Sequence, residues 1–340
     1  MKYNLAILHK IMYYVNQLKK FVRMCKYLTR RRKDMFKYSL KRIVSMTITL
    51  FLIATITFIL MRSIPGGPFT SERNLTPEIE QALMEKYNLD APLHEQYFDY
   101  MKNLLKGDLG VSYKKKGVTV NEIIAQTFPA SAQIGLLAVL LILVIGIPLG
   151  ILSALKQNSA IDYVIMIIAT IGVTIPSFVI GTFIMYIFGE KLALIPAGGL
   201  EEWKGYIGPV IALAGFSVAY VTRLTRSTML EVLRQDYIRT ARANGLSKWR
   251  VIGKHALKNA LIPVVTYVGP MIASILTGSF VVEKIFAIPG MGKYFVESVT
   301  NRDYTIIMGI TIFYAAIYIV MVFIVDIIYG LLDPRIKLKD

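Results

Sequence analysis

The sequence is poor in the residues that build catalytic and metal sites. It holds one cysteine, Cys25, and three histidines (His9, His94 and His255) that fall in different predicted loops. A single cysteine excludes an internal disulfide, and scattered histidines lack metal-ligand spacing. No G-x-x-x-x-G-K-[ST] phosphate loop, nucleophile elbow or H-E-x-x-H motif is present. The run PGMGK at Pro289–Lys293 is too short to be a phosphate loop. We therefore expect no catalytic residue, cofactor or metal ion, and no enzyme.

Charged residues are also missing from six long runs, in a chain that is 55% hydrophobic. A helix that crosses a bilayer needs about 20 apolar residues. Unpaired backbone groups are costly in hydrocarbon and no alternating barrel pattern appears, so we predict an all-α polytopic membrane protein with six transmembrane helices. The second run exceeds the bilayer thickness, and its helix is expected to start near Pro129. The runs are Ile43–Met61, Ile123–Ala154, Tyr163–Gly189, Gly205–Thr222, Asn259–Val282 and Tyr304–Val325.

The net charge of +17 is unevenly distributed. Residues 1–42 hold thirteen Lys/Arg and one acid, and residues 223–258 hold nine Lys/Arg and two acids, whereas residues 63–128 hold seven Lys/Arg and nine acids. Basic loops mark the cytoplasmic side of a membrane protein. We therefore expect both termini and the 223–258 loop in the cytoplasm of a multi-pass protein of the cell membrane, and no nucleic-acid partner.

These signals divide the chain into five segments. Residues 1–42 form a basic cytoplasmic extension, where apolar residues at three- and four-residue steps fit either a helix on the inner leaflet or a loosely ordered tail. We do not expect a signal peptide there, because lysines interrupt any apolar core. Residues 43–62 form the first transmembrane helix, 63–128 an external segment, 129–332 a five-helix transmembrane domain with a loop at 231–260, and 333–340 a cytoplasmic tail.

The external segment is too long for a simple turn. Pro65, Gly66, Gly67 and Pro68 are expected to stop the first helix. Thr76 before Pro-Glu predicts a short helix, and a second amphipathic stretch follows Pro92. A helical cap of this size serves either internal packing or the docking of another protein.

Glycine and proline interrupt two of the apolar runs, at Gly146-x-Pro148-x-Gly150 and at Gly172, Pro176 and Gly181. Such residues allow close helix packing or kinks, and kinked helices also line translocation paths. The ionisable residues Arg62, Asp162, Glu283 and Asp326 lie near predicted span ends, where snorkelling or pairing is inexpensive. An ion-coupled carrier needs a buried carboxylate, and Asp326 is the only candidate in the sequence. A polar contact at the end of a helix explains Asp326 better.

The basic loop between the fourth and fifth runs has a helical pattern. Ser227–Ala243 is expected to be one helix that extends into the cytoplasm, Gly245 permits a turn, and Ser247 caps a second helix. In that second helix Leu246, Trp249, Ile252, Ala256 and Leu257 are expected to share a face with a basic rim. Such a helix suits either insertion into a groove on a partner protein, with Trp249 as the anchor, or a position on the bilayer surface.

Several separated motifs resemble one family. The run RTARANG at Arg239–Gly245, followed by ALKNALIPVVT at Ala256–Thr266, is similar to the cytoplasmic EAA loop of membrane subunits of binding-protein-dependent ABC importers. IPGGPFTSER, IFAIPGMGKYFVESVTNRDY and DPRIK resemble the B-type permease subunits of oligopeptide importers in the dipeptide/oligopeptide permease family. The resemblance covers roughly residues 36–339. The loop departs from the general pattern, because Arg239-Thr240-Ala241 stands in place of Glu-Ala-Ala.

The resemblance implies a type I ABC importer fold and a set of functional residues. The EAA loop would form the coupling helix that contacts an ATP-binding subunit, with Ala241 and Gly245 allowing close packing and the turn. The implied ATPase-coupling residues are Arg239, Ala241, Arg242, Gly245, Leu246, Trp249 and Arg250. The implied residues for docking an extracellular solute-binding protein are Pro65, Gly66, Gly67, Pro289, Gly290, Arg302 and Asp303.

The resemblance also implies partners and a function. They are a second homologous permease subunit, two ATP-binding subunits that hydrolyse ATP, a solute-binding protein, a peptide substrate and the lipid bilayer. The expected function is import of oligopeptides by alternating access. A related importer of dipeptides, nickel or another small solute remains an alternative, as do an ion-coupled secondary carrier and a non-transporting membrane scaffold.

Overall fold

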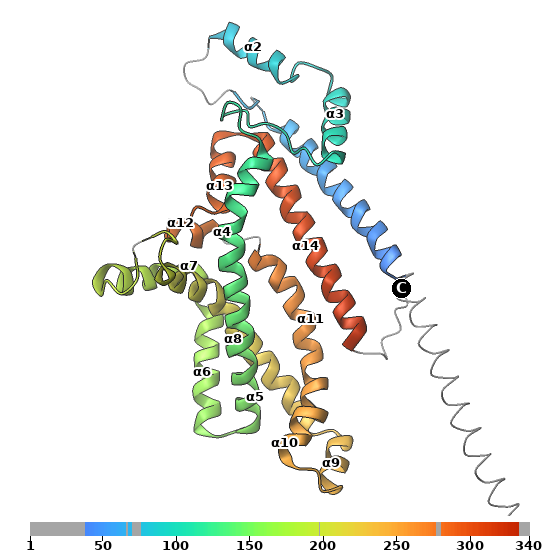
Figure 1. The fold of residues 1–340 in the computed structure, drawn as a ribbon, viewed down its shortest axis with the longest axis vertical. Helices are drawn as coiled ribbons and strands as arrows, with labels where there is room; N and C mark the ends of the chain where they lie inside the picture. The colour runs from blue at the N-terminus through green and yellow to red at the C-terminus, as the bar shows by residue number, and fades with distance from the viewer. Residues whose placement is uncertain (1–37, 66, 70–75, 197, 277–279, 333–340) are drawn as a thin grey trace, which may run out of the picture. The chain divides into compact units, whose positions relative to one another are not determined.

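The computed structural model describes residues 38–65, 67–69, 76–196, 198–276 and 280–332 (Figure 1). Within these ranges the chain is helical, apart from loops and one isolated bridge between Val111 and Thr119. The all-α prediction is confirmed. The N-terminal segment up to residue 37 and the tail 333–340 lie outside the described residues. The chain divides into two compact units, of which Leu50–Tyr329 is the larger and holds all of the elements discussed below except the start of the first helix and the end of the last one.

Among the described residues, five helices are long and apolar enough to cross a membrane, or six if a bent helix pair counts as one span. This agrees with the six predicted runs. The five helices are Tyr38–Ser63, Val120–Leu155, Trp203–Leu233, Lys248–Leu276 and Tyr304–Ile327. They contain α4 (Val120–Leu141), η1 (Ile142–Gly146), α5 (Ile147–Leu155), η3 (Trp203–Tyr206), α8 (Ile207–Leu233), α10 (Lys248–Arg250), η4 (Val251–Ala256), α11 (Leu257–Leu276) and part of α14 (Tyr304–Leu332).

The third apolar run is the bent pair. Its helix α6 (Ala160–Thr174) is followed by α7 (Ser177–Ile184) and η2 (Met185–Lys191), and the two directions differ by 101°. Pro176 disfavours a helical conformation at the preceding residue, and Ile175 is extended, with ψ of 124°. The predicted kink in this run therefore lies at Pro176.

The second run starts earlier than predicted. Helix α4 begins at Val120, and Pro129 lies inside it. A capping box explains the earlier start, because Thr119 Oγ1 accepts from the Glu122 amide and the Glu122 carboxylate accepts from the Thr119 amide. The prediction of a start near Pro129 was wrong, since an interior proline frees only one carbonyl of a long helix.

The shorter helices lie at the two ends of the bundle. Helices α2 (Pro77–Lys86), α3 (Leu93–Leu105), α12 (Phe280–Ile285) and α13 (Met291–Asn301) follow the first and fifth spans, and α9 (Asp236–Ala243) follows α8. Helices α2 and α3 occur where the starts at Thr76 and after Pro92 were predicted. Helices α9 and α10 lie at the opposite end of the unit from α3 and α13 (Figure 1).

Helix α8 lies at the centre of the bundle, in contact with α4, α5, α6, α7 and α11. Glycines bring these helices close together. A Cβ at Gly150 would lie 2.5 Å from Thr225 Cβ and 2.6 Å from the Thr222 carbonyl oxygen, and one at Gly172 would lie 2.9 Å from Ala219 Cβ. Of the two interpretations offered by the sequence, close helix packing is the one that these contacts support.

Candidate functional site

The basic loop after α8 differs from the predicted single helix. Helix α8 ends at Leu233, and α9 forms separately from Asp236 after an extended Gln235. The prediction of one helix over Ser227–Ala243 was wrong. The chain turns because Ile238 and Ala241 of α9 are buried in a cluster with Met229 of α8, so α9 folds back onto the bundle.

The turn after α9 is as predicted. Gly245 has a φ of +75°, which favours glycine. Ser247 occupies the N-cap position of α10, although its side chain makes no capping hydrogen bond. The following helix is longer than expected, because α10, η4 and α11 run continuously from Lys248 to Leu276. The loop is thus directly connected to two membrane-crossing helices.

The predicted shared face was wrong, because its members lie on different sides of the helix. Ile252 and Ala256 are buried against α8 and α9, whereas Trp249 is 79% exposed. A π-helical segment runs from Val251 to Ala256 and changes the rotation per residue. The apolar face of this helix holds the loop to its own bundle, and the tryptophan points away from it.

The predicted coupling residues therefore divide into two groups. Ala241 is buried and Leu246 is half-buried, so both support the loop from within. The other five are exposed and form a surface that we call the basic tip: Arg239, Arg242, Gly245, Trp249 and Arg250. Arg239 forms an exposed ion pair of 3.5 Å with Asp236, which contributes little to stability. The basic tip is thus an accessible cationic surface with one aromatic side chain.

At the other end of the bundle, two residues predicted for docking are internal. Asp303 is 1% exposed, accepts from Ser112 Oγ at 2.5 Å and accepts from the Tyr113 amide at 3.3 Å. A Cβ on the buried Gly290 would lie 2.3 Å from Glu283 Oε2. These positions do not lie on the outer surface of the chain. Asp303 instead joins the loop after α3 to the start of α14.

The remaining docking residues are more accessible. Arg302 has a φ of +57° and donates from Nη1 to the Pro65 carbonyl oxygen at 3.2 Å. This contact joins the end of the first helix to the α13–α14 connection. Pro65 and Pro289 are exposed and Gly67 is partly exposed, while Gly66 lies outside the described residues.

Glu283 on α12 was predicted to lie at a span end, and it is buried instead. It is 2% exposed, its Oε2 accepts from the Gly292 amide at 2.8 Å, and its Oε1 has no hydrogen-bond partner among the described residues. Burial raises the pKa of the Glu283 carboxyl, and hydrogen bonds from Ser131 and the Gly292 amide oppose that shift. Ser131 also accepts from the Met291 amide at 3.0 Å. The carboxyl group thus connects α12, α13 and α4.

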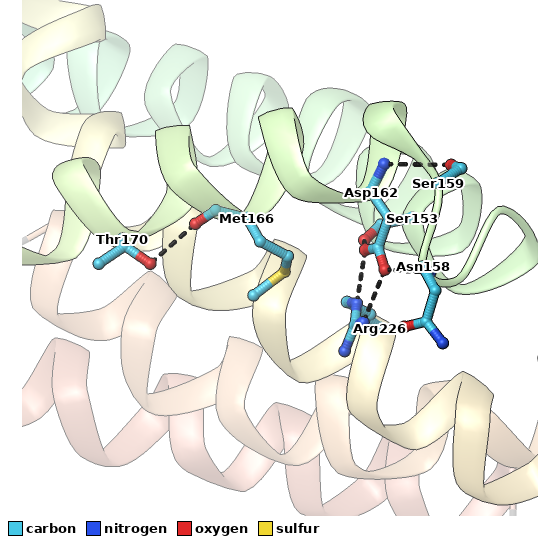
Figure 2. A network of polar contacts seen from close by, with 7 residues as sticks. All are labelled: Ser153, Asn158, Ser159, Asp162, Met166, Thr170 and Arg226. Atoms are coloured by element: carbon cyan, nitrogen blue, oxygen red, sulfur yellow. Dashed lines mark hydrogen bonds and ion pairs between the residues drawn. The ribbon is translucent and has the colours of Figure 1, made fainter.

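Asp162 and Arg226 form a second buried polar contact that the sequence did not reveal (Figure 2). Arg226 donates from Nε and Nη2 to the two Asp162 oxygens, each at 2.7 Å. Ser153 Oγ and the Asn158 amide also donate to Asp162. The network joins α5, α6 and α8 just before α8 leads to the basic tip. Asp162 and Arg226 each follow an apolar run at its predicted cytoplasmic end. Nothing else in the sequence indicated that the two residues form a pair.

Comparison with known proteins defines the class. Residues 146–338 match the family described as the binding-protein-dependent transport system inner membrane component, and residues 35–135 match the N-terminal part of such membrane components. Together these matches cover most of the sequence. The chain belongs to this family and is the permease subunit of a binding-protein-dependent ABC importer.

Individual relatives extend the match. The chain is 49% identical to the dipeptide transport system permease protein DppB of Bacillus subtilis, over 89% of this chain and 99% of that one. It is 45% identical to the oligopeptide transport system permease protein OppB of Haemophilus influenzae, over 89% and 100% of the two chains. In fold it is similar to the inward-facing MetNI methionine ABC transporter, with a TM-score of 0.50, 16% identity and coverage of 62% of this chain and 96% of that one. This similarity confirms the importer permease fold.

We predict that Asp162→Ala destabilises the protein strongly. The substitution leaves the Arg226 guanidinium without its partner in a mostly buried site, at a cost of about 3–5 kcal/mol. The matched control is Asp236→Ala, which breaks the exposed pair with Arg239 and costs about 0–1 kcal/mol. Thermal unfolding of the purified importer complex measures both.

If Asp162→Ala does not fold, the double variant Asp162→Ala/Arg226→Met restores folding, because it removes both charges. Equal stability of Asp162→Ala and Asp236→Ala would contradict the assigned role of the pair.

We also predict that Glu283→Gln changes how stability depends on pH. Because burial raises the folded-state pKa of Glu283, its contribution is fully present below its ordinary pKa and is lost as pH rises through the raised value. Glutamine does not ionise, so the variant gains stability relative to the wild type as pH rises from the ordinary pKa of glutamate through the raised value. Melting temperatures of the two complexes across this range test the prediction, and parallel curves would refute it.

Proposed function

We propose that the importer served by this permease carries peptides across the cell membrane by alternating access. One observation supports this substrate class above the others. The dipeptide and oligopeptide permeases are 49% and 45% identical to the chain over nearly their whole lengths.

The proposed complex contains a second homologous permease subunit, two ATP-binding subunits and an extracellular solute-binding protein. With the bent pair counted as one span, six membrane crossings form half of a pathway between two subunits. The sequence carries no phosphate-binding loop. ATP hydrolysis therefore belongs to separate chains in this proposal. The basic tip and both termini lie in the cytoplasm, as the distribution of lysine and arginine supports.

The basic tip is the proposed contact with the ATP-binding subunits. Tryptophan and arginine are the residue types that most often dominate protein interfaces, and burial of an aromatic side chain supplies roughly 1.5–3 kcal/mol. Trp249 and Arg250 are adjacent and exposed. The buried residues Ile238, Ala241 and Ile252 fasten the tip to α8 and α11, so a displacement of the tip displaces both helices.

The opposite end of the bundle is the proposed contact with the solute-binding protein. Pro65 and Pro289 are exposed there, and the Arg302 contact with Pro65 joins the two connections that carry them. The buried carboxyl groups of Glu283 and Asp303 hold these connections in place without contacting the partner. Helices α2 and α3 belong to the same surface in this proposal.

We predict that Trp249→Ala lowers the amount of ATP-binding subunit that co-purifies with the permease by about tenfold or more, since loss of about 1.4 kcal/mol changes an equilibrium tenfold. Its matched control is Trp203→Ala, which removes the other exposed tryptophan, 72% exposed and outside the basic tip. Co-purification from detergent measures both variants.

The same variants report on function in vesicles. The complete wild-type complex imports labelled tri- to pentapeptides only when ATP is present, Trp203→Ala retains this uptake, and Trp249→Ala loses most of it. Normal association and uptake with Trp249→Ala would refute the coupling role. Absence of ATP-dependent peptide uptake by the wild-type complex would refute the substrate class.

A further inference from the structure

We propose that α8 and α11 together present one face to a water-filled path, along which the substrate moves. This inference rests on the proposed import of peptides and adds the residues that line the path. We call this surface the polar face: Tyr220, Arg223 and Ser227 of α8, and Asn259, Pro263, Thr266, Pro270 and Ser274 of α11. All eight residues are exposed in the chain.

The residues of α11 follow helical spacing. Asn259, Pro263, Thr266, Pro270 and Ser274 are separated by steps of three or four residues, which places them on one side of the helix. Every member is polar or proline. This stripe continues through a helix that is otherwise apolar enough to cross a membrane.

The two prolines free two backbone carbonyl groups from their usual helical hydrogen bonds. Proline has no amide hydrogen, so Pro263 and Pro270 leave the carbonyl groups of Asn259 and Thr266 without their usual helical donor. An unpaired carbonyl in hydrocarbon costs several kcal/mol. Water or a passing amide group satisfies such a carbonyl, and a lipid chain does not.

Helix α8 adds a second stripe beside the first. Phe216, Tyr220, Arg223 and Ser227 are exposed and are also spaced by three or four residues. The rings of Tyr220 and Tyr267 of α11 have centroids 4.3 Å apart, so the two stripes adjoin. The result is a surface with hydroxyl groups, the aromatic ring of Tyr220 and one cation at the end nearer the basic tip.

The other membrane-crossing helices expose large aliphatic side chains. On the first helix Leu52 and Ile56 are exposed, on α4 Leu137, and on α6 Ile167 and Ile168. These aliphatic side chains suit lipid.

A second permease subunit is a less suitable occupant of the polar face than water. Membrane helices pack on each other through small residues that let their backbones approach. Gly146, Gly150 and Gly172 provide such contacts within this chain, each against α8. The polar face instead carries Tyr220, Arg223 and two prolines, which keep another helix at a distance.

The chemistry of the polar face suits a peptide of variable sequence. A peptide backbone presents amide donors and carbonyl acceptors at every residue, and the side chains of Tyr220, Asn259 and Thr266 are able to exchange hydrogen bonds with them. Aromatic rings contact many kinds of side chain. No acidic residue occurs in the polar face, so the surface imposes no selection for a cationic solute.

Cysteine labelling of the complete complex in vesicles tests the proposal. In a Cys25→Ser background, Thr266→Cys and Tyr220→Cys are compared with the lipid-facing controls Leu137→Cys and Ile168→Cys. The probe is a charged, membrane-impermeant methanethiosulfonate. We expect the polar-face cysteines to react about tenfold faster or more than the controls, because thiol reaction with this reagent needs water.

Three results overturn the proposal. The first is an equal reaction rate at all four positions, and the second is labelling of the polar face only by a lipid-soluble maleimide. The third is oxidative cross-linking of Thr266→Cys to the second permease without labelling by the charged reagent. The first two place lipid on the polar face, and the third places the other subunit there.

A transport measurement separates this proposal from the proposed function. Thr266→Trp fills the path and lowers ATP-dependent peptide uptake without releasing the ATP-binding subunits, whereas Leu137→Trp leaves uptake unchanged. Uptake unaffected by Thr266→Trp would count against the path. If the charged reagent labels the polar-face cysteines but the wild-type complex imports no peptide, the path is retained and the peptide substrate is refuted.

Discussion

The cost of an unpaired polar group in a low-dielectric interior governs this structure. It requires the membrane-crossing segments to be helical, and it requires each buried charge to have a partner. Asp162 meets this condition with a bidentate arginine, a serine hydroxyl and a backbone amide. Asp303 meets it with Ser112 and backbone amides. In both cases a carboxylate connects segments that are far apart in the sequence.

Helix α8 combines three features that the proposed function needs. Its centre carries Tyr220 on the polar face, the following turns carry Arg226 in the buried ion pair, and its end leads to the basic tip. Close contacts at Gly150 and Gly172 hold α5 and α6 against it. A force applied at the basic tip is therefore transmitted to a packed group of helices, since dense packing does not absorb small displacements.

The sequence predicted well those features that depend on local composition. The apolar runs identified the membrane-crossing helices because hydrocarbon excludes charge over a whole span, and Gly245 identified a turn that needs positive φ. Features that depend on distant residues were not predictable. Asp162 and Arg226 lie 64 positions apart, and only the fold brings them together. Trp249 is exposed, as its predicted role as an anchor needs, but Ile252 and Ala256 pack against α8 and α9, which helical periodicity alone does not reveal.

The same distinction explains why the family motif mixes two kinds of residue. In the basic loop, Ala241 and Leu246 are needed by the chain itself, because they pack the loop onto the bundle, whereas Arg239, Arg242, Trp249 and Arg250 are exposed. A motif of this kind records folding and partner binding together. Substituting a buried member moves the whole loop and thereby disturbs every exposed member, while substituting an exposed member leaves the scaffold intact. Only the exposed residues therefore report directly on a partner.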